Sequence, residues 1–78
     1  MNYIQKNSKL WAFPETIGFE SVPGYLSSFM ELADYNEIIY DLSGTRTLHT
    51  SFIGFLIHTK HLAHKKNMSI KLILSPAA

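Results

Sequence analysis

The chain has 78 residues, which is room for one domain, and it contains no cysteine, which excludes a disulfide framework and thiolate metal sites. Hydrophobic residues make up 46% and charged residues 17% of the chain, and no apolar run approaches the length of a signal peptide or a membrane span. We therefore expect a soluble, cytoplasmic globular protein without membrane insertion. Of the two halves of the chain, residues 41–78 are the basic one, but their basic residues are too sparse to predict nucleic-acid binding.

The first half of the chain predicts a hairpin followed by a helix. Residues 2–13 are typical of two short strands around a polar turn at Asn7–Ser8. Pro23 suits the first turn of a helix. Apolar residues then recur at helical spacing as far as Ala33, so we expect an amphipathic helix that ends near residues 34–36.

The second half predicts two buried strands joined through a second helix. Residues 37–42 and 69–74 are short, nearly continuous apolar runs, which is typical of strands buried on both faces. Between them, residues 51–66 predict a helix with lysines at its C-terminal end, where cations interact favourably with the helix dipole. We expect the two strands to be parallel, with a right-handed crossover between them. The residues predicted for the core are Ile39, Leu42, Ile53, Leu56, Ile70 and Leu72.

The order of elements is therefore strand, strand, helix, strand, helix, strand. This order predicts a small α/β sandwich in which helices pack on a mixed four-stranded sheet, with residues 1–78 forming a single domain. The low share of charged residues also favours a surface that a partner protein or a second copy of the chain covers.

Three histidines in the second predicted helix repeat at intervals of three and share one face: His58, His61 and His64. Histidines at such a spacing can bind zinc. However, no carboxylate lies in this helix, and three lysines share its C-terminal half. We therefore interpret the histidines as a solvated polar face and expect no metal or other cofactor.

His49, Thr50 and Ser51 stand side by side where the second helix begins. Adjacent residues rarely place a base within reach of a hydroxyl, and the chain has neither a nucleophile elbow nor a glycine-rich phosphate loop, so we do not expect an enzyme. We expect Ser51, or Thr50 if the helix begins one residue earlier, to cap the helix through its hydroxyl. Capping leaves phosphorylation open, because a helix N-terminus also favours negative charge.

The segment 37–76 resembles the STAS domain, the fold of bacterial anti-sigma factor antagonists and of sulphate-transporter tails. In that family a buried strand ends in Asp-Leu-Ser, and a loop, an Asp-Ser-Ser-Gly-like motif, a helix and a strand ending near Ser-Pro follow. Asp41, Leu42 and Ser43 match the strand end. The other matches are Gly54 and Leu56 early in the helix and residues 75–76 at the exit of the last strand. Residues 16–33 are similar to the family's first helix and its lead-in, so the resemblance covers nearly the whole chain.

The resemblance also points to a phosphate acceptor. In the phosphorylatable members, the hydroxyl residue just before the motif's glycine accepts phosphate from a serine kinase that doubles as anti-sigma factor. The matching residue is Ser51, with Thr50 beside it. Here His49 stands where the family's aspartate is usual, and Phe52 stands where glycine is usual. These two departures suit a diverged member that scaffolds a complex through unmodified contacts.

The resemblance implies a non-enzymatic binding module in signal transduction and transcription regulation. Its partner would be an anti-sigma factor with serine kinase activity or a larger signalling scaffold. The residues implied in partner binding are His49, Thr50, Ser51, Phe52, Ile53 and Gly54. An alternative is an accessory subunit of a bacterial ABC system that moves lipids. The resemblance further implies a helix after Pro76, which this sequence does not include, so we expect a partner or a second copy to cover apolar surface beside the last strand.

Overall fold

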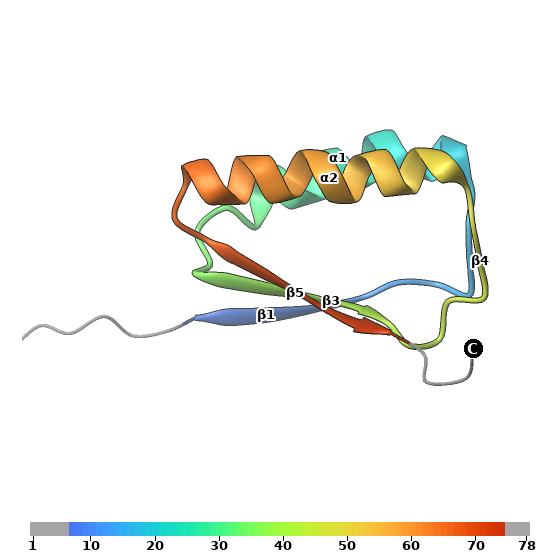
Figure 1. Ribbon diagram of the computed structural model, residues 1–78, viewed down its shortest axis with the longest axis horizontal. Helices are drawn as coiled ribbons and strands as arrows, with labels where there is room; N and C mark the ends of the chain where they lie inside the picture. Colours follow the sequence, from blue (N-terminus) through green and yellow to red (C-terminus); the bar gives the residue numbers. More distant parts are fainter. Residues whose placement is uncertain (1–6, 75–78) are drawn as a thin grey trace, which may run out of the picture.

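The computed structural model describes residues 7–74 and arranges them in two layers (Figure 1). The helices α1 and α2 form one layer, and the strands β1, β3 and β5 form the other. In chain order the elements are β1 (Ser8–Ala12), β2 (Thr16–Ile17), the short 3-10 helix η1 (Phe19–Ser21), α1 (Val22–Glu31), β3 (Glu37–Leu42), β4 (Thr47–Leu48), α2 (Thr50–Lys65) and β5 (Ser69–Leu74).

Strand β3 lies at the centre of a three-stranded sheet, in the order β1-β3-β5, and pairs in parallel with both neighbours. Trp11, Tyr40 and Leu72 stand at one level across the three strands. The crossovers through α1 and α2 run in the same direction across the sheet, which places both helices on the same face (Figure 1). The α/β class and the predicted parallel pairing of residues 37–42 with 69–74 are confirmed.

The predicted mixed four-stranded sheet is wrong. Strands β2 and β4 pair with each other in parallel and form a separate two-stranded sheet, in which Ile17 lies opposite Leu48. The hairpin turn is also wrong where the structure describes it, because Ser8 already belongs to β1, and β1 pairs in parallel with β3. The first strand of that hairpin, within residues 2–6, lies outside the described residues.

The helix-covered face of the sheet carries the core. Along β3, Ile38, Tyr40 and Leu42 are buried, and the residues between them are only half-buried. Because both helices pack on one side, the other face of the sheet has no covering layer among residues 7–74 (Figure 1). The prediction that these strands are buried on both faces is therefore wrong. Strand β5 is an edge strand, and its residues Leu72, Ile73 and Leu74 are exposed.

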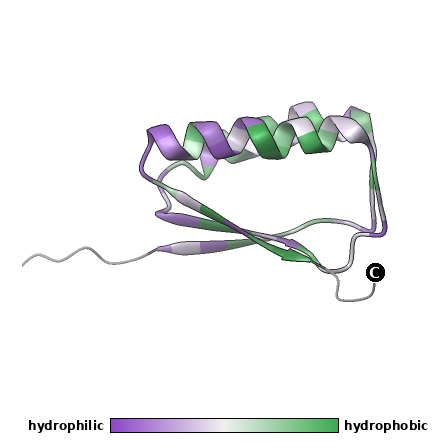
Figure 2. Cartoon of the chain, in the orientation of Figure 1, coloured by the Kyte–Doolittle hydropathy of each residue, from purple (hydrophilic) through white to green (hydrophobic). Residues whose placement is uncertain are grey.

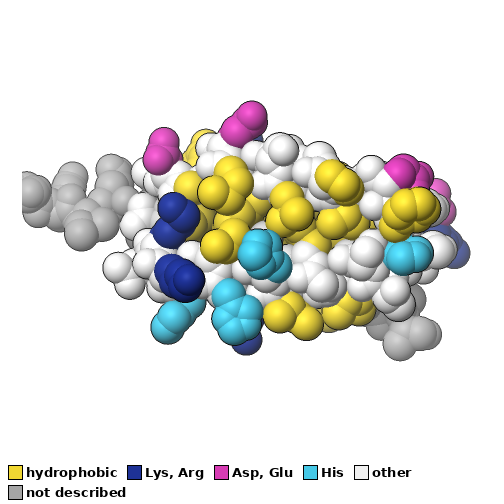
Figure 3. Space-filling view, turned by 90° about the horizontal axis from the view of Figure 1, so that it is seen from above, with side chains coloured by type: hydrophobic (Ala, Val, Ile, Leu, Met, Phe, Trp, Pro, Cys, Tyr) yellow, Lys and Arg dark blue, Asp and Glu magenta, His cyan; other side chains and the backbone are white. Residues whose placement is uncertain are grey.

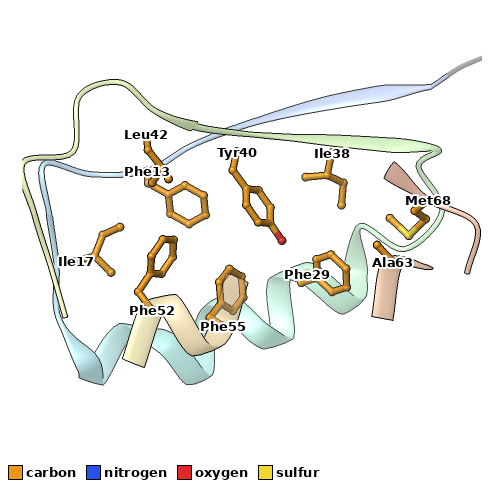
Figure 4. Close-up of a cluster of buried hydrophobic side chains, with 10 residues drawn as sticks. All are labelled: Phe13, Ile17, Phe29, Ile38, Tyr40, Leu42, Phe52, Phe55, Ala63 and Met68. Carbon is orange, nitrogen blue, oxygen red and sulfur yellow. The ribbon is translucent and has the colours of Figure 1, made fainter. Parts of the chain in front are cut away.

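Aromatic rings fill the space between the layers (Figure 4). Phe52 stacks on Phe55 with ring centroids 5.3 Å apart, and Phe13 meets Phe52 edge-on at 5.1 Å. Such aromatic pairs contribute about 0.5–1.5 kcal/mol each beyond the burial of their area. The remaining buried hydrophobic residues are Ile17, Phe29, Ile38, Tyr40, Leu42, Ala63 and Met68.

The predicted core is correct in part. Leu42 is buried, and Leu56 and Ile70 pack partly buried against the cluster. The other three predicted core residues lie outside it: Ile39, Ile53 and Leu72. Ile53 is 47% exposed because α2 turns the neighbouring Phe52 towards the sheet, and Leu72 is 49% exposed because β5 lies at the sheet edge. Ile39 is half-buried on the uncovered face of β3.

The helix boundaries lie close to the predicted ones. Helix α1 ends at Glu31, a few residues before the predicted end, and α2 begins and ends one residue earlier than predicted. Just past α2, Asn67 adopts a positive φ of 60°, a conformation that asparagine tolerates, and the Met68 N–H donates to Ala63 O at 2.8 Å. Figure 2 shows hydrophobic residues towards the first half of α2 and hydrophilic residues at its C-terminal end.

Candidate functional site

The start of α2 is positioned by the two-stranded sheet. Strands β2 and β4 connect the sheet layer to the helix layer (Figure 1). The His49 N–H donates to Ile17 O at 2.9 Å, and the Arg46 N–H donates to Glu15 O at 2.8 Å. Ile17 is buried, so these bonds tie the chain before α2 to the core. The arrangement also brings His49 beside Phe19, with ring centroids 5.5 Å apart.

His49 caps α2 with its side chain. Its backbone is extended (φ −77°, ψ 150°), and its Nδ1 accepts a hydrogen bond from the Ser51 N–H at 3.0 Å. The predicted cap, Ser51 or Thr50, is therefore wrong. Because the helix begins at Thr50, Ser51 is its second residue and lies past the capping position.

The same imidazole also reaches the Ser51 hydroxyl. Ser51 Oγ lies 2.9 Å from His49 Nδ1, so a neutral imidazole protonated on Nε2 accepts from both the N–H and the O–H of Ser51. This contact corrects the expectation that neighbouring residues leave base and hydroxyl out of reach, because the cap folds the imidazole over the first turn. No carboxylate in the described part of the chain hydrogen-bonds this imidazole, so the pair lacks the third member of a catalytic triad.

The first turn of α2 divides into core and surface. Phe52 is fully buried, whereas Thr50, Ile53 and Gly54 are exposed and Ser51 is half-buried. Of the six residues implied in partner binding, Phe52 is therefore the one whose side chain lies in the core. A Cβ added at Gly54 would meet no atom within 4 Å, so the surface around this glycine is open.

Exposed apolar side chains surround this turn. Phe19 is 64% exposed, Ile53 is 47% exposed and Leu48 is 36% exposed. Figure 3, which looks onto the helix layer, shows hydrophobic side chains along this face with histidines among them. We refer to six residues as the α2 N-terminal surface: Phe19, Leu48, His49, Thr50, Ser51 and Ile53. The sequence pattern did not indicate Phe19, because only the β2–β4 pairing brings it to the start of α2, and it did not indicate Leu48, which lies two residues before the helix.

The Asp-Leu-Ser segment closes β3 with a tight turn. Asp41 Oδ1 accepts from the Ser43 hydroxyl at 2.7 Å and from the Ser43 N–H at 3.0 Å. Both hydrogen bonds hold the pKa of Asp41 below its usual value. The bond from the Ser43 hydroxyl has the larger effect and the bond from the Ser43 N–H the smaller one. The Thr45 N–H donates to Leu42 O at 3.0 Å in the same turn. The Asp41 carboxylate therefore orders the loop that leads to β4 and His49.

The three helix-borne histidines, His58, His61 and His64, are exposed on α2. Within residues 7–74, no group of three or more histidine, cysteine, aspartate or glutamate side chains is arranged to hold a metal ion. No helix in this range is long and apolar enough to cross a membrane.

Comparisons of the chain with models of protein families, with curated proteins and with solved structures found no match. The resemblance to STAS domains therefore depends on the sequence alone, chiefly on residues 41–43, Gly54 and the position of Ser51. What the fold contributes is the geometry around Ser51.

Proposed function

We propose that the chain is a regulatory protein-binding module of the STAS type, which binds its partner through the α2 N-terminal surface and is switched by phosphorylation of Ser51. The observation that carries the proposal is the contact of 2.9 Å between Ser51 Oγ and His49 Nδ1, at the surface and among exposed apolar side chains. The resemblance to STAS domains assigns the phosphate acceptor to the same position.

A phosphate on Ser51 is compatible with the fold. It would add about −1.5 to −2 charges at the second residue of α2, where the helix dipole favours negative charge. The same charge would stand beside His49, whose ring centroid lies 5.5 Å from that of the exposed Phe19, on a surface that also includes the exposed Ile53. A partner that buries these side chains would have to desolvate the phosphate as well, so phosphorylation should release it.

The two departures from the family motif, which in the sequence alone suit unmodified contacts, are compatible in this fold with phosphorylation of Ser51. Phe52 replaces the usual glycine, but its side chain lies in the core and leaves the surface beside Ser51 open. His49 replaces the usual aspartate and supplies both the helix cap and a hydrogen-bond acceptor for the serine hydroxyl.

A phosphorylation assay tests the switch. The wild-type protein, Ser51→Ala and Thr50→Ala are incubated with ATP and an extract of the native host, and the phosphate is located by mass spectrometry. We expect phosphate on Ser51 in the wild type and in Thr50→Ala, and none in Ser51→Ala. Phosphate on Thr50 instead, or on neither residue, would refute the switch.

A capture experiment tests the binding surface separately. Ile53→Glu places a charge on the α2 N-terminal surface, and Ile73→Glu places one on the uncovered face of the sheet at a similarly exposed position, 42% against 47%. We expect Ile53→Glu to lose a host protein that the wild type and Ile73→Glu both retain. If Ile53→Glu retains every protein that Ile73→Glu retains, the α2 N-terminal surface is not the binding site.

A further inference from the structure

A second feature of the molecule, independent of the α2 N-terminal surface, is an open groove between α2 and the edge strand β5. The groove has a volume of about 430 Å³, within the usual range of ligand sites. Its floor and walls are mainly apolar, with Lys60 and His64 at the helix side. The apolar residues that line it are Leu56, Ile57, Ala63, Met68, Ile70 and Leu72.

The groove is open because β5 is a sheet edge. Among residues 7–74, β5 pairs with β3 alone, so its other side presents unpaired backbone N–H and C=O groups. Ile57 on the helix and Leu72 on the strand flank the opening and are 55% and 49% exposed. The opposite edge is different, because at the level of Leu72 strand β1 carries Trp11, whose ring packs edge-on against Tyr25 of α1.

The charge around the groove has one sign. Residues 42–74 contain no aspartate or glutamate, while α2, its C-cap residue and β5 carry four lysines: Lys60, Lys65, Lys66 and Lys71. Lys71 points to the uncovered face of the sheet, where it forms an ion pair with Glu37 at 3.3 Å. The other three have no carboxylate within ion-pair distance in the described part of the chain. Figure 3 shows lysine and histidine side chains gathered near one end of the helix layer, with acidic side chains along the upper margin, including at that end, and at the opposite end.

We propose that this groove binds an acidic peptide segment of a partner protein, which extends the sheet as a strand beside β5. The backbone of the peptide would pair with the free edge of β5, so that every second side chain faces the groove. Among these groove-facing side chains, apolar ones would enter the groove and carboxylates would face Lys60 and the lysines at the end of α2. A second copy of the chain fits this edge poorly. A symmetric β5–β5 contact would bring the two lysine-bearing helices together without any carboxylate between them.

The probe is a short synthetic peptide, capped at both ends and titrated into isotope-labelled protein. Threonine takes every second position, and valine and glutamate alternate at the positions between, so that both can face the groove. We expect one peptide per chain, with chemical-shift changes and slowed amide hydrogen exchange concentrated in β5. A peptide with lysine in place of glutamate should bind at least about tenfold more weakly, as should one with N-methylated backbone amides.

Matched variants locate the site. Leu72→Glu and Lys60→Glu should each weaken binding of the glutamate peptide about tenfold or more, because they remove an apolar anchor or a cation of the groove. Leu10→Glu and Lys9→Glu make the same changes on the opposite edge strand, β1, and should bind like the wild type. All four residues are exposed, so the variants should keep the circular-dichroism spectrum of the wild type.

Three outcomes would overturn the proposal. They are equal binding of the lysine peptide, equal binding by Leu72→Glu, and light scattering that shows a dimer dissociated by Leu72→Glu. The last result would assign the edge to a second copy of the chain.

Discussion

The buried hydroxyl of Tyr40 donates a hydrogen bond of 2.9 Å to Thr59 Oγ1, and this bond joins the central strand β3 to the middle of α2. Both side chains are fully buried, and burial raises the pKa of Tyr40 to about 12 in spite of the opposing effect of the Thr59 bond. Thr59 in turn donates to Leu56 O at 3.2 Å. The pair thereby fixes the position of α2 over the sheet, and with it the α2 N-terminal surface at one end and the groove beside β5.

The Tyr40–Thr59 hydrogen bond predicts that substituting its acceptor lowers the free energy of unfolding more than substituting its donor. Thr59→Val leaves the tyrosine hydroxyl buried without an acceptor and should lower the free energy of unfolding by about 1–3 kcal/mol. Tyr40→Phe removes that hydroxyl and leaves the bond from Thr59 to Leu56 O intact, so it should cost only about 0.5–1.5 kcal/mol. Urea unfolding measures both costs. A larger loss for Tyr40→Phe than for Thr59→Val would contradict the assignment of donor and acceptor.

The turn at Asp41 predicts a dependence of stability on acid pH. The bonds to Ser43 lower the pKa of Asp41 in the folded state. The ionised carboxylate therefore stabilises the fold fully at a pH above the pKa of the unfolded state, about 3.9. This stabilisation is lost as the pH falls through the lower pKa of the folded state. The wild type should therefore be more stable than Asp41→Asn at neutral pH, and the difference should shrink in acid. Thermal unfolding of both proteins across a pH series checks this; a constant difference would show that the charge of Asp41 plays no part.

The first turn of α2 predicts opposite results for two neighbouring apolar residues. Phe52→Ala empties a fully buried site and should cost about 3–5 kcal/mol, a large share of the stability of so small a domain. Ile53→Ala changes a residue that is 47% exposed and should stay within about 0.5 kcal/mol of the wild type. Thermal unfolding followed by circular dichroism compares them. Similar losses for the two variants would mean that α2 is rotated relative to the arrangement described above.

Substitution of Gly54 by alanine should change stability and partner binding in opposite directions. A glycine inside a helix is less favourable than alanine by about 0.5–1 kcal/mol, and a Cβ at Gly54 would meet no neighbouring atom. Gly54→Ala should therefore stabilise the protein but weaken partner binding, because the added methyl group lies beside Ser51 and Ile53. Gly24→Ala, in α1, is the matched control: its Cβ also meets nothing, so it should stabilise to a similar degree and leave binding unchanged. Unchanged binding by Gly54→Ala would place the partner away from this turn.

Periodic patterns predicted the long elements well, because helix and strand periods are properties of each segment alone. Residues 37–42 and 69–74 are parallel strands, and α2 lies within one residue of its predicted range. The pattern of a single segment does not predict which face of the sheet the helices cover or which strand lies at the edge. Residues 69–74 are as apolar as a central strand, yet β5 lies at an edge and exposes Leu72.

The candidate site shows the same division between local and long-range information. The position of Ser51 in the first turn of α2 follows from the hydrophobic pattern after it. The roles of His49 and Phe19 do not, because they depend on the β2–β4 pairing between segments of two residues each, which are too short to give a sequence signal. Hydroxyl and carboxylate side chains are the usual helix caps, so the imidazole cap of His49 was also missed.

The most direct test of the proposed switch uses the host protein that the wild type captures and Ile53→Glu does not. Its binding is titrated with the wild type, Ser51→Ala and Ser51→Asp. Ser51→Ala keeps the surface uncharged and should bind like the wild type, since the Ser51 N–H can still donate to His49. Ser51→Asp should fold normally, because a helix N-terminus favours negative charge, yet bind about tenfold or more weakly. Binding of Ser51→Asp with wild-type affinity would contradict the account, because charge at Ser51 would then have no control over the partner.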